Sequence, residues 1–537
     1  MTLRRGALVA LPLGFLAIFY VYPVVSILLT GLVEDGLFDF TPFVEVLRSP
    51  SFRGVAWFTI WQAVASTALT VLAAMPIAYV LARYESPGKR LISALLTVPF
   101  VMPTVVVGSA FLALLGSQSP IGINLSRTIW IIFAAHVFFN LSVVVRTVGG
   151  LWSHLDPRLE EAARSLGATR WQAFRTTTLP LLRPALVAAT SIVFLFTFTS
   201  FGVILILGGL TYATLEVEIY RQTTAVLNFP IAAALAIVQL VGVTAILWFY
   251  TRYQRRRDVG LSLLPAGSVA RRPSTLRQRL TVTATIAYLA VLVLVPLAVL
   301  VGRSFDAGSP LRFYQALTET GTGSTAFVSP LEAIGNSLWI AATATVIALV
   351  IGMSAAAVVA YSEGRAARSF DLLLMLPLGT SAVTIGFGML IALDWPVDLR
   401  ANVLLIPLAH ALVAIPFVVR LSVPVMRSVQ PRLREAAAML GASPARIWRE
   451  IDLPIAARAL AVSAGFAFAI SLGEFGATSF IARPDTPTLP IAIFRLLGRP
   501  GALNFGQAMA MSTILMAVTA AVVLLVDRMR IRDVGEF

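Results

Sequence analysis

Long apolar runs, each followed by a short polar segment, repeat along the whole chain. A bilayer core about 30 Å thick requires roughly 20 consecutive apolar residues in a helix, and each run meets that length. The pattern therefore predicts an all-α integral membrane protein with about twelve transmembrane helices. The first six are expected near residues 7–32, 55–83, 91–116, 128–151, 184–207 and 231–251, and the second six near 280–302, 334–361, 370–393, 402–426, 458–481 and 506–527.

Composition strengthens the membrane assignment and narrows the chemistry. Of the 537 residues, 58% are hydrophobic and 12% are charged, whereas about 25% are charged in soluble domains. The chain has no cysteine and three histidines, so thiolate sites and a zinc hydrolase are not expected and no metal site is predicted. The net charge of +15 falls between apolar runs, which favours anionic lipid over nucleic acid as a partner.

Basic segments alternate with acidic or mixed ones along the chain. Basic residues concentrate in 89–90, 158–183, 252–279, 365–368, 427–458 and 528–532. The segments between them carry acidic residues such as Glu216, Glu218 and Asp398. The positive-inside rule then predicts that both chain ends are cytoplasmic. The first apolar run exceeds the 7–15 residue core of a signal peptide, so we expect it to remain as a transmembrane helix.

The chain repeats itself along most of its length. At a separation of 278 and later 274 residues, identical residues recur in matching apolar runs. Examples are Trp61 and Trp339, Pro99 and Pro377, His136 and His410, Phe201 and Phe475, Thr214 and Thr488, and Arg221 and Arg495. This predicts two six-helix halves, 1–253 and 280–537, joined by an Arg-rich cytoplasmic linker at 254–279. Because six is an even number, both halves point the same way, and a path is expected between them. The linker could lie at anionic headgroups or be a solvated tether.

One polar motif occurs in both halves, in segments expected to be cytoplasmic. The first copy contains Glu161, Ala162, Ala163, Gly167, Leu179 and Pro180, and the second contains Glu435, Ala436, Ala437, Gly441, Ile451, Leu453 and Pro454. The spacing predicts a short helix, a glycine hinge and a second helix. A helix-hinge-helix can also bind DNA, but each copy is tied to membrane helices at both ends and its arginines are interrupted by acidic residues. No nucleic-acid partner is therefore expected.

Capping signals define the two helices of the first copy. Asp156 is an expected N-cap for a helix reaching Leu166, and Gly167 can adopt the left-handed conformation that ends it. Thr169 with Gln172 forms a capping box for the second helix, which we expect to end at Pro180. In the second copy, Ser443 followed by Pro444 provides the equivalent start.

The motif resembles the signature loop of the membrane subunits of binding-protein-dependent ABC importers. That signature is Glu-Ala-Ala, three residues, Gly, nine residues, Ile, one residue and Leu-Pro. The second copy matches every defined position, while Thr177 replaces the isoleucine in the first. The resemblance implies the type I importer permease fold, in which this loop is the coupling helix that docks in a cleft of a cytoplasmic ATPase. By that resemblance, Glu161, Gly167, Glu435 and Gly441 are docking residues.

The resemblance also implies the partners. Lys89 lies in a segment without the leading glycine of a phosphate-binding loop, so the chain is not expected to be an ATPase. We expect two copies of a separate ABC ATPase, one for each loop, and an extracytoplasmic substrate-binding protein. ATP is then used by the partner, and this chain binds no cofactor. The implied location is the inner (plasma) membrane of a prokaryote.

Within that family the chain looks like the fused double permeases of the thiamine and ferric-iron group. The thiamine branch is resembled best at 136–141, 207–209, 214–220 and 471–476. Ser142 departs from it, since that branch tends to have proline, which only the second half keeps as Pro416. The resemblance favours a thiamine-type substrate, with ferric iron or another small solute as the alternative.

Three ionisable residues fall inside predicted helices. His136 and His410 lie about 12 Å into helices that enter from outside, and Glu474 lies about 24 Å into a helix that leaves the cytoplasm. Ionisable groups at such depths are costly unless they are paired or face a cavity. They could therefore line a path for a cationic solute, with Glu474 as its acid. Alternatively, the histidines bridge helices and Glu474 caps a broken helix.

Two other classes of function share some of these features. An ion-coupled secondary transporter would also show twelve helices and parallel repeats, but it would need intramembrane carboxylates, of which Glu474 is the one good candidate, and no paired docking loops. A permease that lost transport and serves as a sensor or scaffold is the third option. The sequence favours an ATP-driven importer that works by alternating access and catalyses no covalent chemistry itself.

Overall fold

The computed structural model describes residues 2–34, 36–85, 88–209, 211–255, 269–306, 308–318, 328–362, 364–428 and 431–529. These residues are mostly helical, and their strands are the two-residue β1 (Val33–Glu34) and β2 (Leu37–Phe38), which pair antiparallel.

Helices in the first half of the chain are α1 (Thr2–Leu16), α2 (Tyr22–Leu32), α3 (Thr41–Arg48), α4 (Pro50–Arg83), α5 (Lys89–Val101), α6 (Thr104–Leu115), α7 (Ile129–Trp152), α8 (Arg158–Ser165), α9 (Arg170–Ala173), α10 (Leu179–Phe198), α11 (Gly202–Leu207), α12 (Leu215–Arg221) and α13 (Phe229–Arg255). Three π-helical turns accompany them: η1 (Ala17–Val21), η2 (Phe174–Thr178) and η3 (Gln222–Val226).

Helices in the second half are α15 (Leu276–Arg303), α16 (Arg312–Gln315), α17 (Pro330–Tyr361), α18 (Arg365–Met375), α19 (Ala382–Ala392), α20 (Leu405–Ser428), α21 (Pro431–Met439), α22 (Pro444–Ile447), α23 (Leu453–Gly473), α24 (Thr478–Ile481), α25 (Leu489–Leu497) and α26 (Ala502–Met529). The shorter turns are η4 (Ala316–Thr318), η5 (Leu376–Gly379) and η6 (Trp448–Asp452).

The described residues contain nine helices that are long and apolar enough to cross a membrane, and up to twelve spans when each of three bent pairs counts as one. The predicted all-α membrane fold with about twelve helices is therefore confirmed. Two spans expected to be continuous, 91–116 and 370–393, are bent by 109° and 97°. In the first, Met102 is extended (ψ 136°) because Pro103 follows it and disfavours helical geometry there.

The span expected at 184–207 is also wrong as a single helix, because α10 ends at Phe198 and α11 begins at Gly202. The second half breaks at the equivalent place, between α23 and α24. A Cβ on Gly202 would lie 2.5 Å from the hydroxyl oxygen of Thr104. The glycine therefore lets α11 approach the bent segment at α6, and this contact fixes where the helix breaks.

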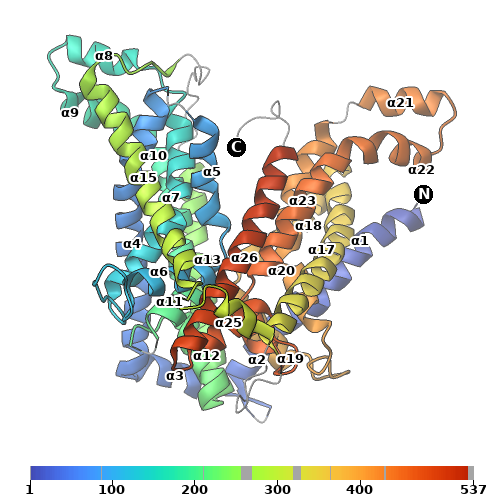
Figure 1. Cartoon of the computed structure of the whole chain (residues 1–537). Helices are drawn as coiled ribbons and strands as arrows, with labels where there is room; N and C mark the ends of the chain where they lie inside the picture. The colour runs from blue at the N-terminus through green and yellow to red at the C-terminus, as the bar shows by residue number, and fades with distance from the viewer. Residues whose placement is uncertain are drawn as a thin grey trace.

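The first helices of each half also pack against the other half. Helix α1 packs against α17, and α2 packs against α19 of the other half as well as α13 of its own; α15 packs against α6 and α4 of the first half as well as α26 of its own (Figure 1). Figure 1 also shows that the bundles diverge toward the end that carries α8, α9, α21 and α22, and lie together at the opposite end. The division into 1–253, 254–279 and 280–537 stays a prediction, since the first helices of each half pack against both halves.

The described end of the linker is attached to the first half. The amide of Arg271 donates to the carbonyl oxygen of Arg83 at 3.1 Å, and the amide of Glu85 donates to that of Arg271 at 3.0 Å. Residues 256–268 of the linker lie outside the described residues. The linker thus continues into α15 from a fixed point beside α4.

Candidate functional site

Both copies of the repeated motif form projecting helix-hinge-helix loops. Helices α8 and α9 extend from one bundle, and α21 and α22 extend from the other, at the same end of the molecule (Figure 1). Gly167 and Gly441 have φ of +91° and +82°, so the predicted left-handed hinges are confirmed. Only glycine takes such a conformation at little cost.

Caps start the helices on both sides of the first hinge and the helix after the second hinge. The Asp156 carboxylate accepts from the amide of Arg158 at 2.9 Å and starts α8. Thr169 and Gln172 form the predicted capping box, with hydrogen bonds of 3.2 and 2.8 Å. The hydroxyl of Ser443 accepts from the amide of Arg446 at 3.4 Å. These caps are local, which is why the sequence was enough to predict them.

The expectation that the second loop helix ends at Pro180 is wrong. Helices α9 and α10 are joined through η2 and form one continuous rod from Arg170 to Phe198. Helix α22 also passes through η6 into α23, with Pro454 in the first turn of α23, but this second rod is bent by 55° between Ala457 and Ala459. A proline ring clashes with the carbonyl four residues earlier in an α-helix, and a π turn displaces that carbonyl. Each loop is therefore continuous with a membrane helix.

A side-chain contact ties the first helix of each loop to its rod. In the first copy, Thr178 donates to Glu160 at 3.1 Å. At the equivalent positions of the second copy, Arg434 pairs with Asp452 at 2.8 Å, and Arg434 also donates to the hydroxyl of Tyr361 at 2.6 Å. Hydrogen bonds between charged groups are stronger than neutral ones. The first loop has its ion pair elsewhere, between Glu161 and Arg271 at 3.7 Å, so both loops are tied to the rest of the chain by a charged contact.

The predicted docking residues lie on the surface of these loops. Glu161, Ala162, Glu435, Ala436 and both hinge glycines are exposed, Ala163, Leu179, Pro180, Ala437 and Ile451 are half-buried, and Leu453 and Pro454 are exposed. Leu166 and Leu440, each directly before a hinge glycine, are 90% and 88% exposed. Sequence reasoning did not single out these leucines, although they occupy equivalent positions. Each loop thus presents an exposed leucine beside its hinge.

His136 joins three segments of the first bundle. Its Nδ1 lies 2.9 Å from the hydroxyl of Ser66 on α4, and its Nε2 lies 2.9 Å from the hydroxyl of Ser200. The side chain comes from α7 and is 2% exposed. It therefore fixes the end of α10, where the helix breaks, to α4 and α7.

His410 and Glu474 form the equivalent group in the second bundle. His410 lies 2.7 Å from both the Ser471 and Thr478 hydroxyls, and its Nε2 is 3.3 Å from the Glu474 carboxylate. That carboxylate also accepts from the amides of Ala477 and Thr478 at 2.8 and 3.0 Å. These contacts bridge helices and cap α24, as the alternative interpretation expects. A role of His136, His410 or Glu474 in the path stays a prediction.

A row of four aromatic rings crosses from one bundle to the other. Phe201 and Phe475 stack with centroids 5.4 Å apart, at positions separated by 274 residues. Tyr220 packs edge-on against Phe201 at 5.5 Å, and Phe494, its equivalent, packs in the same way against Phe475 at 5.4 Å. The local twofold axis therefore passes between Phe201 and Phe475. The sequence paired these residues as repeats but did not predict their contact.

Beside this row, a buried carboxylate links the two halves. Glu216 on α12 is fully buried and accepts from Gln239 on α13 and, at 3.1 Å, from Ser381, which caps α19. The sequence predicted that Glu216 lies in a polar segment outside the membrane helices. The prediction of a polar environment is wrong, because the side chain is buried. Burial of a carboxylate requires hydrogen-bond donors, and here one donor comes from the other half.

Within the described residues, no group of three or more histidine or acidic side chains is arranged to hold a metal ion. The arrangement instead connects surface loops to the contact between the two halves. Two surface loops are each continuous with a membrane helix, and these helices end beside the aromatic row.

Comparisons with known proteins relate the chain to membrane subunits of transport systems. The family of binding-protein-dependent transport system inner membrane components matches the chain twice, at residues 74–259 and 348–532. The thiamine transport system permease protein ThiP of Brucella abortus is 30% identical over 88% of this chain and 87% of its own length. A Sinorhizobium fredii protein described as a probable ABC transporter permease, y4fN, is 25% identical over 95% of this chain and 94% of its own. A bacterial alginate ABC importer structure has a TM-score of 0.37 and 21% identity, covering 46% of this chain and 93% of that one.

Proposed function

The chain belongs to the family of binding-protein-dependent transport system inner membrane components, and from this premise we propose that it is the fused permease subunit of an ATP-driven importer. It receives a small solute from an extracytoplasmic binding protein and passes it into the cytoplasm. The observation that carries the proposal is the pair of equivalent loops at one end of the molecule (Figure 1). Two loops provide docking sites for two copies of a cytoplasmic ABC ATPase, and both chain ends are then cytoplasmic.

The helical rods couple the loops to the aromatic row. Residues 170–198 form one helical rod, about 43 Å long at 1.5 Å per residue. ATP binding brings the two ATPases together, and the loops move with them. Because the rods end next to Phe201 and Phe475, their movement separates the stacked rings. The path then closes at the loop end and opens at the external end, which is alternating access.

We favour a thiamine-type solute as the cargo. Support comes from the 30% identity to a thiamine permease over most of both chains. The alternatives are ferric iron or another small solute, because a separate binding protein selects the cargo in this class of importer. An ion-coupled transporter is disfavoured by the two docking loops.

Reconstitution tests the proposal directly. The chain is placed in proteoliposomes with its ATPase and binding protein, and ATP hydrolysis is measured with thiamine or ferric iron. We expect thiamine to stimulate hydrolysis and ATP to drive its uptake. Stimulation by ferric iron alone would overturn the choice of cargo. Uptake driven by an ion gradient without ATP would overturn the assignment of the chain to an ATP-driven importer. Absence of any uptake would favour a role as a sensor.

Glu474→Gln tests the acid proposed for the path. We expect uptake of the cationic cargo to fall at least threefold while co-purification with the ATPase is retained, because the amide keeps one acceptor oxygen but loses the charge. Glu332→Gln is the matched control, since Glu332 is also a capping carboxylate at the start of a helix in this half and glutamine serves in a capping box. Wild-type uptake by Glu474→Gln would remove the path role and leave the capping role.

A further inference from the structure

Equivalent arginines on α12 and α25 differ in their partners. On α12, Arg221 makes two hydrogen bonds to the carboxylate of Glu218, at 2.9 and 2.6 Å. On α25, the equivalent arginine is Arg495, and Ala492 occupies the position equivalent to Glu218. Within the described part of the chain, no carboxylate lies within ion-pair distance of Arg495. The second half thus keeps the cation and lacks its internal anion.

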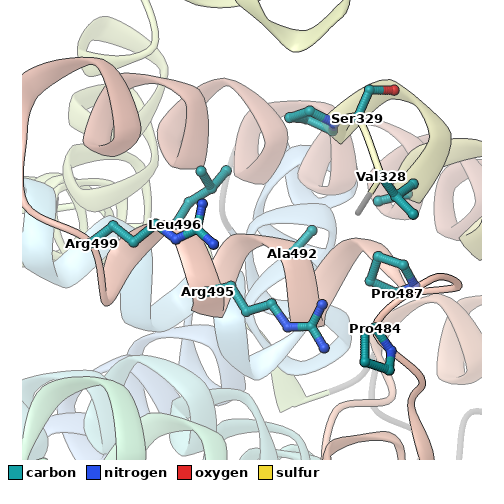
Figure 2. A pocket seen from close by; sticks show the side chains of 10 residues that line it. Val328, Ser329, Pro484, Pro487, Ala492, Arg495, Leu496 and Arg499 are labelled. Carbon is teal, nitrogen blue, oxygen red and sulfur yellow. The ribbon is translucent and has the colours of Figure 1, made fainter. Parts of the chain in front are cut away.

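A cavity occupies the place left by the missing carboxylate. Its volume is about 220 Å³, and both Ala492 and Arg495 line it. Figure 2 shows the Arg495 guanidinium extending toward Pro484 and Pro487 on the rim. The cavity is therefore lined by two positive groups, Arg495 and Arg499, is shaped by rigid prolines and has room for a short side chain.

The position of α25 identifies the side from which a partner approaches. Helices α12 and α25 lie at the end of the molecule opposite to the α8–α9 and α21–α22 loops (Figure 1). If those loops face the ATPase, as the proposed function states, the cavity faces outward. The extracytoplasmic binding protein is the macromolecule that must dock at that side.

We propose that Arg495 receives an aspartate or glutamate side chain of the binding protein, which enters this cavity and takes the place that Glu218 has beside Arg221. This inference rests on the proposed function and adds the residue that receives the partner. A single exposed ion pair contributes about 0–1 kcal/mol, too little to hold a free anion. A carboxylate carried on a docked protein is held in place by the rest of the interface, so the pair adds orientation and selectivity.

Two substitutions in the reconstituted importer test the proposal from opposite directions. Arg495→Gln removes the cation, and Ala492→Glu supplies an internal carboxylate three residues before it, as in α12. We expect each to raise the binding-protein concentration for half-maximal ATPase stimulation about threefold to fivefold, with basal hydrolysis unchanged. The increase corresponds to an ion pair of up to about 1 kcal/mol. Ala492→Glu keeps the arginine and extends into the cavity, so its result does not depend on the fold tolerating loss of the arginine.

Arg400→Gln is the matched charge control. Arg400 is on the same side of the molecule, where its hydrogen bonds hold the pKa of Asp398 below its usual range, and it does not line the cavity. Its substitution is expected to leave the half-maximal concentration unchanged. Glu319 is outside the described residues, and Glu319→Gln tests whether an acid of this chain is the partner.

The outcomes separate this inference from the function it rests on. If the binding protein stimulates the wild type and both cavity variants behave like it, the docking role of Arg495 is wrong and the importer stands. If the binding protein stimulates none of the proteins, the proposed function fails. Competition by acetate at constant ionic strength would assign the cavity to a small anion, and a matching effect of Glu319→Gln would assign it to this chain.

Discussion

Replacing Gly441 with valine is expected to lower ATP-driven uptake at least tenfold while the chain still inserts and purifies as the wild type does. Gly441 has φ of +82°, a conformation that costs an L-residue about 1–2 kcal/mol and a β-branched residue more. The loop relieves this cost by changing its path at the hinge. Leu440, which is 88% exposed and directly precedes the glycine, then no longer points to its docking site. Uptake and binding-protein-stimulated ATP hydrolysis are the two measurements.

Gly122→Val is the matched control for backbone strain. Gly122 has φ of +72°, lies in the segment between α6 and α7, and has no atom within 4 Å of an added Cβ. Its substitution imposes the same kind of strain away from the loops, so uptake is expected to persist. Gly167→Val is expected to lower uptake less than Gly441→Val does, because Thr177 replaces the signature isoleucine in the first loop. Wild-type coupling in Gly441→Val would contradict the docking role of the hinge.

The sequence predicted those features that depend on nearby residues. Span lengths follow from run length, and the caps at Thr169 and Ser443 depend on residues within one helical turn. The break after Phe198 could not be predicted, because apolar residues continue on both sides of it. Its position is set by the close approach of Gly202 to Thr104, which are distant in sequence. Pro180 misled the interpretation because a π turn, which has no simple sequence signal, absorbs the proline.

The centre of the site was predictable only in part, because its contacts cross between the halves. The environment of Glu216 depends on Ser381, 165 residues away, so its segment looked like an external loop. The repeat did pair Phe201 with Phe475, and a twofold axis requires some equivalent residues to meet their own counterparts. Buried aromatic pairs in a parallel repeat are therefore candidates for contacts on the axis. That signal was present, but the choice among the pairs required the structure.

The double substitution Phe201→Ala and Phe475→Ala is expected to raise ATP hydrolysis in the absence of binding protein at least tenfold and to reduce coupled uptake. Truncating a buried phenylalanine costs about 3–5 kcal/mol, and these two rings stack only when the halves lie together at this end. The cost therefore falls on the state in which the row is closed. Each 1.4 kcal/mol of differential loss shifts the balance between states tenfold. Hydrolysis by the purified complex in proteoliposomes measures the shift.

Phe194→Ala is the matched control, because Phe194 stacks on Phe198 within the single helix α10, with centroids 5.9 Å apart. A pair within one rigid helix is present in both states, so its loss leaves basal hydrolysis at the wild-type rate.

The chain has no cysteine, so Phe475→Cys introduces a unique thiol in the row. A membrane-impermeant maleimide added outside is expected to label it only with ATP and binding protein present. Equal labelling without them, or unchanged hydrolysis in the double variant, would show that the aromatic row does not close the path.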